Sequence, residues 1–163
     1  MGTFGNSYLN PMASSVSQPG NLRWFEYRVQ AHPHYTDYGG IVWHGSYIAW
    51  MEEARVECLR SLGTEFSDCV DAGCDLPVID LTIRYHQPIQ HGKTAIVKTR
   101  PTRTKGVRLL WDYRIESPDG KTLYTTAQVT LVAIDRARRT IIRILPQCLE
   151  DLLDYFAIPT DTP

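Results

Sequence analysis

The chain has 163 residues, of which 43% are hydrophobic and 21% charged, a composition typical of one soluble globular domain. Its formal net charge of -1 gives no reason to expect nucleic acid or an anionic membrane as a partner. No run of residues approaches the roughly 18 apolar positions that a membrane span needs, and the N-terminus lacks the pattern of a secretory signal. We therefore expect a cytoplasmic protein. Its four cysteines are expected to be free thiols, because they match no zinc pattern: Cys58, Cys69, Cys74 and Cys148.

Residues 1–20 are rich in Ser, Gly, Asn and Pro, which predicts a flexible leader. Large apolar and polar side chains then alternate from Trp24 to Ala31, a pattern that predicts a half-buried strand. Pro33 is expected to end this strand, because proline cannot donate to a sheet ladder. We expect a single domain over residues 21–158, followed by a short tail at 159–163.

The hydrophobic period changes between Ser46 and Leu62. Apolar residues recur there at steps of three and four, which predicts a long helix with a broad apolar face. Gly63 is expected to end the helix, since glycine is favoured just beyond a helix C-terminus. So broad an apolar face indicates a helix that is covered on more than one side.

The second half of the chain predicts a sheet. After a short helix near Glu65–Ala72, four runs rich in Val, Ile, Thr, Tyr and Trp span 77–86, 94–104, 107–116 and 121–134. The short turns between them favour an antiparallel meander. Residues 141–145 are expected to extend the sheet, and 146–156 to form a C-terminal helix. The order of elements indicates an α+β domain in which the long helix lies on the sheet.

The stretch from Asp37 to His44 joins the first strand to the long helix. Asp37 precedes two glycines, Gly39 and Gly40, which permit positive φ and a close backbone approach to a ligand. The helix is expected to begin just after His44, where unpaired backbone N–H groups bind anions or a polarised carbonyl oxygen. A carboxylate beside such N–H groups suits the hydrolysis of an activated acyl group.

Two simpler interpretations of this stretch remain open. Asp before Gly-Gly is also ordinary turn chemistry, and a histidine near a helix start can be a surface or capping residue. A metal site built from His32, His34, Asp37 and His44 is a weaker alternative, because no helical His pair or Cys ligand pair supports it. We expect no metal.

The same residues resemble a known family, the hotdog-fold acyl-CoA thioesterases. The resemblance is to the 4-hydroxybenzoyl-CoA thioesterase family and its Tol–Pal-associated acyl-CoA thioesterase branch. It runs from about Phe25 to Pro146. Its most specific part is the run Asp37-Tyr38-Gly39-Gly40-Ile41-Val42-Trp43-His44-Gly45-Ser46-Tyr47, followed by Trp50-Met51-Glu52-Glu53-Ala54-Arg55.

This resemblance implies a hotdog fold, an antiparallel sheet of five or six strands wrapped around the long central helix. It implies that Asp37 is the catalytic carboxylate, acting as nucleophile or as general base on water. The backbone N–H groups of His44 and Gly45 would form the oxyanion hole, and the His44 side chain would assist. Enzymes of this type build their sites between two subunits, so a homodimer or homotetramer is expected.

The resemblance also assigns binding residues. The acyl pocket is expected to involve Tyr38, Gly39, Gly40, Trp43, Tyr47, Trp50 and Met51, although an apolar helix stripe is as often plain core. Coenzyme A, which is part of the substrate rather than a cofactor, needs basic groups for its phosphates. Arg103, Lys105 and Arg108 are preferred, and Arg136, Arg138, Arg139 and Arg143 are the alternative. Glu52 is expected to pair with Arg55 rather than act as a base.

Two other functions agree less well with these residues. A hotdog dehydratase or isomerase acting on acyl-carrier-protein thioesters would need a His base and a helix acid, and the Asp-Tyr-Gly-Gly block argues against it. A non-catalytic acyl-CoA-binding protein is disfavoured by the intact Asp37. The sequence does not indicate the acyl group, which could be aliphatic or aromatic.

Overall fold

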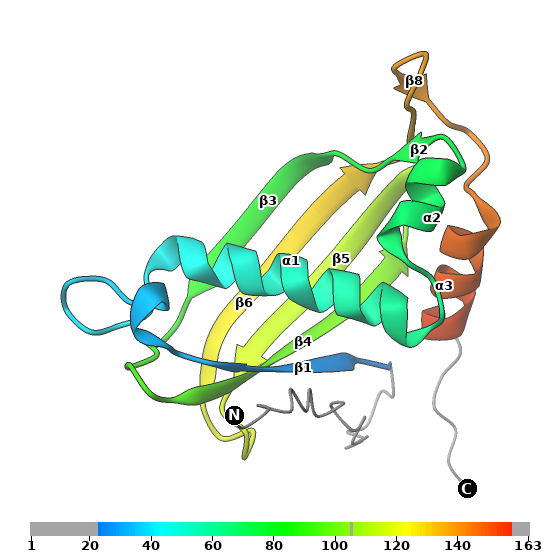
Figure 1. Ribbon diagram of the computed structural model, residues 1–163. Helices are drawn as coiled ribbons and strands as arrows, with labels where there is room; N and C mark the ends of the chain where they lie inside the picture. The colour runs from blue at the N-terminus through cyan, green and yellow to red at the C-terminus, as the bar shows by residue number, and fades with distance from the viewer. Residues whose placement is uncertain (1–22, 105, 158–163) are drawn as a thin grey trace, which may run out of the picture.

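A five-stranded antiparallel sheet forms the body of the protein (Figure 1), and its strands follow the order β1-β4-β5-β6-β3. The computed structural model describes residues 23–104 and 106–157, so the expected leader, the tail and Lys105 lie outside the described residues. The strands are β1 (Phe25–Gln30), β3 (Val78–Tyr85), β4 (Thr94–Arg103), β5 (Arg108–Glu116) and β6 (Leu123–Val132). Each neighbouring pair is antiparallel, as the short turns between them require.

The long helix α1 (His44–Ser61) crosses the inner face of this sheet (Figure 1). Trp50, Met51 and Cys58 are fully buried on it, and they belong to one core cluster with strand residues such as Val97 and Ile115. The helix begins two residues earlier than the predicted Ser46. Trp43 has extended backbone angles and is the N-cap, so helical geometry starts at His44 itself.

Short elements close the other end of the molecule. The helices α2 (Phe66–Asp71) and α3 (Gln147–Ala157) lie near the C-terminal end of α1 (Figure 1). Beside them β2 (Cys74–Asp75), β7 (Ile134–Asp135) and β8 (Thr140–Ile141) form a second, three-stranded sheet. The expectation that residues 141–145 extend the main sheet is therefore wrong. The predicted strand at 121–134 is likewise split after Val132, and its last residues join the small sheet.

The two edges of the main sheet are β1 and β3. Among the described residues, strand β3 pairs only with β6, and it exposes large apolar side chains: Val78, Ile79, Leu81 and Tyr85. An exposed apolar edge is a template for pairing with another chain.

Within the described residues, no helix is both long and apolar enough to cross a membrane. The antiparallel sheet around a long helix confirms the predicted α+β hotdog architecture.

Candidate active site

Asp37 opens a tight turn between the short helix η1 (Pro33–Tyr35) and the start of α1. The N–H of Gly40 donates to the carbonyl oxygen of Asp37 at 3.1 Å, and the N–H of Asp37 donates to that of Ile41 at 2.8 Å. Gly40 has a φ of +75°, a conformation that costs a side-chain-bearing residue about 1–2 kcal/mol. The glycine pair therefore allows the chain to reverse directly after the carboxylate.

The Asp37 carboxylate is held by its own turn. Oδ1 accepts hydrogen bonds from the N–H groups of Gly39 at 2.8 Å and Ile41 at 3.3 Å. Within residues 23–104 and 106–157, Oδ2 has no hydrogen-bond partner. One oxygen thus fixes the orientation of the group, and the other is available to a substrate or to water.

The turn is anchored to the segment that follows β3. The N–H of Val42 donates to the carbonyl of Ile89 at 2.8 Å, and the N–H of His91 donates to that of Gly40 at 2.9 Å. Ile41 and Gln90 form an isolated β-bridge. These bonds place Asp37 beside the C-terminal end of β3, a segment about fifty residues away in sequence.

The start of α1 has unpaired donors. Trp43 donates its N–H to the carbonyl of Tyr35 at 2.8 Å, and Ser46 donates to that of Trp43 at 2.8 Å. Within the part of the chain that the structure describes, the N–H groups of His44 and Gly45 have no such acceptor. The first N–H groups of a helix, at the positive end of its dipole, attract negative charge.

Gly45 is required by packing rather than by its backbone angles. A Cβ atom at this position would overlap the indole ring of Trp43, which covers the first turn of the helix. The His44 imidazole lies against the same indole, with the ring centres 4.7 Å apart. The indole therefore contacts both Gly45 and the His44 ring at the start of the helix.

A cavity of about 380 Å³ lies where the turn, the helix start and the end of β3 meet. Its lining residues are Asp37, Ile41, Val42, His44, Tyr47, Tyr85, His86, Gln87 and Pro88. Asp37 in the turn and His44 at the first position of α1 therefore both line one cavity. Burial raises the pKa of Tyr47 and that of Tyr85, so both phenols stay protonated at neutral pH.

Six of the seven predicted pocket residues do not line this cavity, among them Gly39 and Gly40 of the turn. Tyr38 is fully exposed at the tip of the turn, and Trp43 is half exposed on the outer side of the helix start. Trp50 and Met51 are completely buried in the core and do not reach the cavity. Tyr47 alone among the predicted aromatic and methionine side chains lines it, because it is on the first turn of α1.

Two of the predicted coenzyme A residues, Arg103 and Arg108, lie at the other end of the sheet from the cavity, and Lys105 lies outside the described residues. Arg103 ends β4 and forms ion pairs with Glu150 and Asp154 of α3. Arg108 begins β5 across the same turn. Figure 1 shows this turn beside α3, whereas the start of α1 lies at the opposite side of the sheet. Within one chain, these arginines and the cavity are therefore not brought together.

The two adjacent glutamates of α1, Glu52 and Glu53, each have a side-chain partner. Glu52 forms an ion pair with Arg55, as predicted. Glu53 accepts a hydrogen bond from the Tyr27 hydroxyl at 3.2 Å. No group of three or more His, Cys, Asp or Glu side chains in the described ranges is arranged to hold a metal ion.

Three cavity residues did not come from the motif. Tyr85, His86 and Gln87 follow one another at the end of β3, and the Tyr85 hydroxyl donates to the His44 carbonyl at 2.8 Å. His86 Nε2 lies 2.9 Å from Thr126 Oγ1. The sequence analysis did not single out this segment, because spacing along the chain does not show which loops meet in the fold.

Comparison with known proteins decides the family. The sequence profile of the thioesterase superfamily matches residues 39–124, which span the turn, the helix and most of the sheet. The chain belongs to the thioesterase superfamily. It is 48% identical over 131 residues to the Synechocystis protein sll0410, which is named an esterase, covering 80% of this chain and 79% of that protein. The predicted class of enzyme, a thioester hydrolase, is thereby confirmed.

Two further similarities concern named thioesterases. The enzyme is 30% identical to the acyl-CoA thioester hydrolase YbgC of Escherichia coli O6:H1, covering 71% of this chain and 85% of that protein. It superposes on a DHNA-CoA thioesterase from Staphylococcus aureus with a TM-score of 0.67 and 29% identity, covering 74% of this chain and 80% of that one.

Proposed function

We propose that this thioesterase hydrolyses acyl-CoA, with Asp37 as the catalytic carboxylate and the N–H groups of His44 and Gly45 as the oxyanion hole. The observation that carries the proposal is the shared cavity, which the Asp37 carboxylate and the start of α1 both line. The names of YbgC and of the Staphylococcus aureus enzyme, both of which include CoA, support this class of substrate. Coenzyme A is part of the substrate, and the proposed reaction needs no cofactor.

The chemistry follows from the two groups. The N–H groups would donate hydrogen bonds to the thioester oxygen as negative charge develops on it. One such donor is typically worth about 10²–10³ in rate. Oδ2 of Asp37 would either attack the carbonyl carbon or remove a proton from a water that does so. The C–S bond then breaks, and coenzyme A leaves as the thiolate. In the first route water subsequently hydrolyses the acyl-enzyme anhydride.

The acyl group would lie between Tyr47, Tyr85 and Ile41, which contribute aromatic and aliphatic surface to the cavity. In a single chain this cavity is bordered by exposed residues such as His86 and Pro88. A second subunit would cover it. We place the dimer contact along β3, whose apolar side chains are about half exposed, with Val78 at 49% and Ile79 at 50%.

Such a dimer would also supply the phosphate site. A two-fold axis beside β3 makes the two copies of the strand antiparallel, so the start of one lies near the end of the other. The turn between β7 and β8, with Arg136, Arg138 and Arg139, projects from the end of the fold that holds the start of β3 (Figure 1). Because Arg103 is already paired with two carboxylates, this turn is the better partner for the phosphates.

The test measures release of free coenzyme A thiol from a panel of aliphatic and aromatic acyl-CoAs. Asp37→Asn should reduce turnover by about 10³-fold or more, because it removes the base or nucleophile and keeps the size of the side chain. His44→Ala should cost less, since the backbone N–H remains. Near-wild-type turnover of Asp37→Asn, with the fold intact by circular dichroism, contradicts the assignment. A loss in His44→Ala equal to that of Asp37→Asn would make the imidazole central.

A further inference from the structure

The end of β3 contacts the start of α1 through one hydroxyl group. Tyr85, the last residue of β3, donates its hydroxyl hydrogen to the backbone carbonyl of His44 at 2.8 Å. Its ring packs edge-on against Tyr47, with the ring centres 5.2 Å apart and the planes at 75°. Both rings line the cavity that contains Asp37.

The carbonyl that Tyr85 contacts belongs to the same peptide unit as the N–H of Gly45. A peptide unit is planar, with its C=O and N–H directed to opposite sides, so fixing one fixes the direction of the other. A hydrogen bond to the carbonyl also polarises the unit and strengthens its N–H as a donor. The hydroxyl thus contacts one side of a peptide unit whose N–H, on the other side, has no acceptor among residues 23–104 and 106–157.

We propose that Tyr85 is a positioning residue, which orients and polarises the His44–Gly45 peptide so that the Gly45 N–H binds the thioester oxyanion. This inference rests on the proposed function, because it assigns the Gly45 N–H to the oxyanion hole. Tyr85 itself need not touch the reacting atoms. Its action is through the backbone.

The surroundings suit this role. In an α-helix the carbonyl of the first residue also accepts an N–H from four residues later, and a carbonyl oxygen has two lone pairs, so both bonds fit. Burial raises the pKa of the Tyr85 phenol, which keeps the proton on the hydroxyl across the neutral range. The T-shaped contact with Tyr47 restricts the ring and with it the direction of the hydroxyl.

The test removes only the hydroxyl. Tyr85→Phe should lower kcat by about 3- to 10-fold, the value of one neutral hydrogen bond, and leave KM nearly unchanged. The matched control is Tyr27→Phe. Tyr27 on β1 also donates its hydroxyl to α1, at Glu53 Oε2, but it lies outside the cavity, so its loss should leave kcat unchanged.

A second measurement is independent of turnover. In ¹H–¹⁵N correlation spectra, the Gly45 amide proton of Tyr85→Phe should move upfield, because its peptide carbonyl loses a hydrogen bond while the aromatic ring stays. Tyr27→Phe should leave that signal in place. A lower kcat together with the shifted Gly45 signal supports the positioning role.

The outcomes separate the two proposals. An active Asp37→Asn enzyme would refute the catalytic assignment, whatever the Gly45 signal does. If Asp37→Asn is inactive and Tyr85→Phe keeps the wild-type kcat, Tyr85 has no positioning role. A loss of kcat with an unmoved Gly45 signal also overturns the inference, because the effect would then not pass through the peptide. A raised KM at unchanged kcat would make Tyr85 a binding residue instead.

Discussion

The two ends of helix α1 are built in opposite ways. At its C-terminal end the backbone is closed: the N–H groups of Leu62 and Gly63 donate at 3.0 Å to the carbonyls of Leu59 and Arg60, and Thr64 donates at 3.2 Å to Leu59. At its N-terminal end the N–H groups of His44 and Gly45 have no acceptor from residues 23–104 or 106–157, and His44 lines the cavity. The first end completes the helix, and the second leaves it ready to bind.

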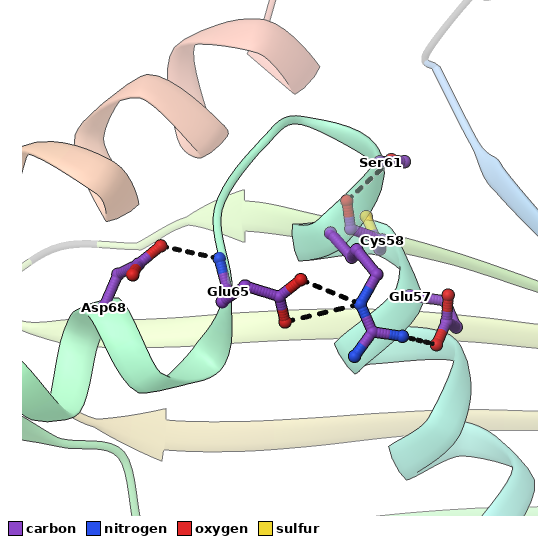
Figure 2. A network of polar contacts seen from close by, with 6 residues as sticks. Glu57, Cys58, Ser61, Glu65 and Asp68 are labelled. Atoms are coloured by element: carbon purple, nitrogen blue, oxygen red, sulfur yellow. Dashed lines mark hydrogen bonds and ion pairs between the residues drawn. The ribbon is translucent and has the colours of Figure 1, made fainter.

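The side chains at the two ends of α1 also differ in their contacts. Figure 2 shows the C-terminal end, where a guanidinium bridges two carboxylates, Glu57 and Glu65, and Asp68 accepts the Glu65 N–H at 2.7 Å. Glu65 and Asp68 also form a capping box that starts α2. At the other end, within the described residues, neither His44 nor Asp37 forms a salt bridge, and both line the cavity. One end of the helix is thus held by ion pairs and capping bonds, and the proposed catalytic groups lie at the other.

Two glycines with nearly the same geometry test this contrast. Gly40, beside Asp37, has a φ of +75°, and Gly63, after α1, has a φ of +77°; an added Cβ would meet no atom within 4 Å at either position. Alanine at each should therefore destabilise the fold by a similar 1–2 kcal/mol or so. Only Gly40→Ala should also reduce thioester hydrolysis, by about tenfold, because the strained turn displaces the Asp37 carboxylate.

The test measures turnover and urea unfolding of Gly40→Ala and Gly63→Ala side by side. Equal losses of activity in Gly40→Ala and Gly63→Ala would mean that activity follows global stability. A stability loss confined to one variant would show that the two glycines are not equivalent.

Much of this arrangement was predictable from the sequence. The apolar steps from Tyr47 to Leu62 predict α1, and the β-rich runs predict four strands of the main sheet. The start of the helix was predicted one to two residues late, because Gly45 is a poor helix former and Trp43 gives no capping signal. The small sheet was missed too, since strands of two residues are too short to show a period.

The site was predictable on one side only. Asp37 and His44 lie in a compact motif, but Tyr85 reaches them only after the chain has folded. The predicted pocket residues Trp50 and Met51 share the same apolar stripe as Tyr47, and periodicity cannot tell a residue that faces the core from one that faces a cavity.

The thiols near the closed end should be protected. Burial raises the pKa of the Cys58 thiol, and it raises that of Cys69 to about 12. Iodoacetamide reacts with the thiolate, so at pH 8 Cys148, which is half buried beside a cavity of about 230 Å³, should be labelled first. Peptide mapping by mass spectrometry measures the order, with the unfolded chain as control. Early labelling of Cys58 would show that this end opens.

The same shifts give a pH dependence of stability. The folded-state pKa of Cys69 lies above the ordinary thiol value of about 8.5, so folding favours the protonated form. Its contribution is complete below about pH 8.5 and is lost as the pH rises toward 12.

The smallest effect is expected at Arg60. Arg60→Met removes the guanidinium that joins Glu57 and Glu65. Arg60 and Glu65 are about half exposed and Glu57 is one-third exposed, so solvent and salt already weaken the pairs. The melting temperature should fall only slightly, and kcat should stay at the wild-type value. Differential scanning calorimetry at low and high salt tests this, and a fall in kcat would mean that the two ends are coupled.

Strand β3 would make the activity of the proposed enzyme depend on its association into a dimer. The same strand carries the apolar edge that we assign to the dimer and, at its last residue, the hydroxyl that holds the His44 carbonyl. A chain that loses its partner would expose that edge and loosen its own Tyr85. Specific activity would then depend on protein concentration, so the amount of enzyme in the cell would set both the number of sites and the fraction of them that work.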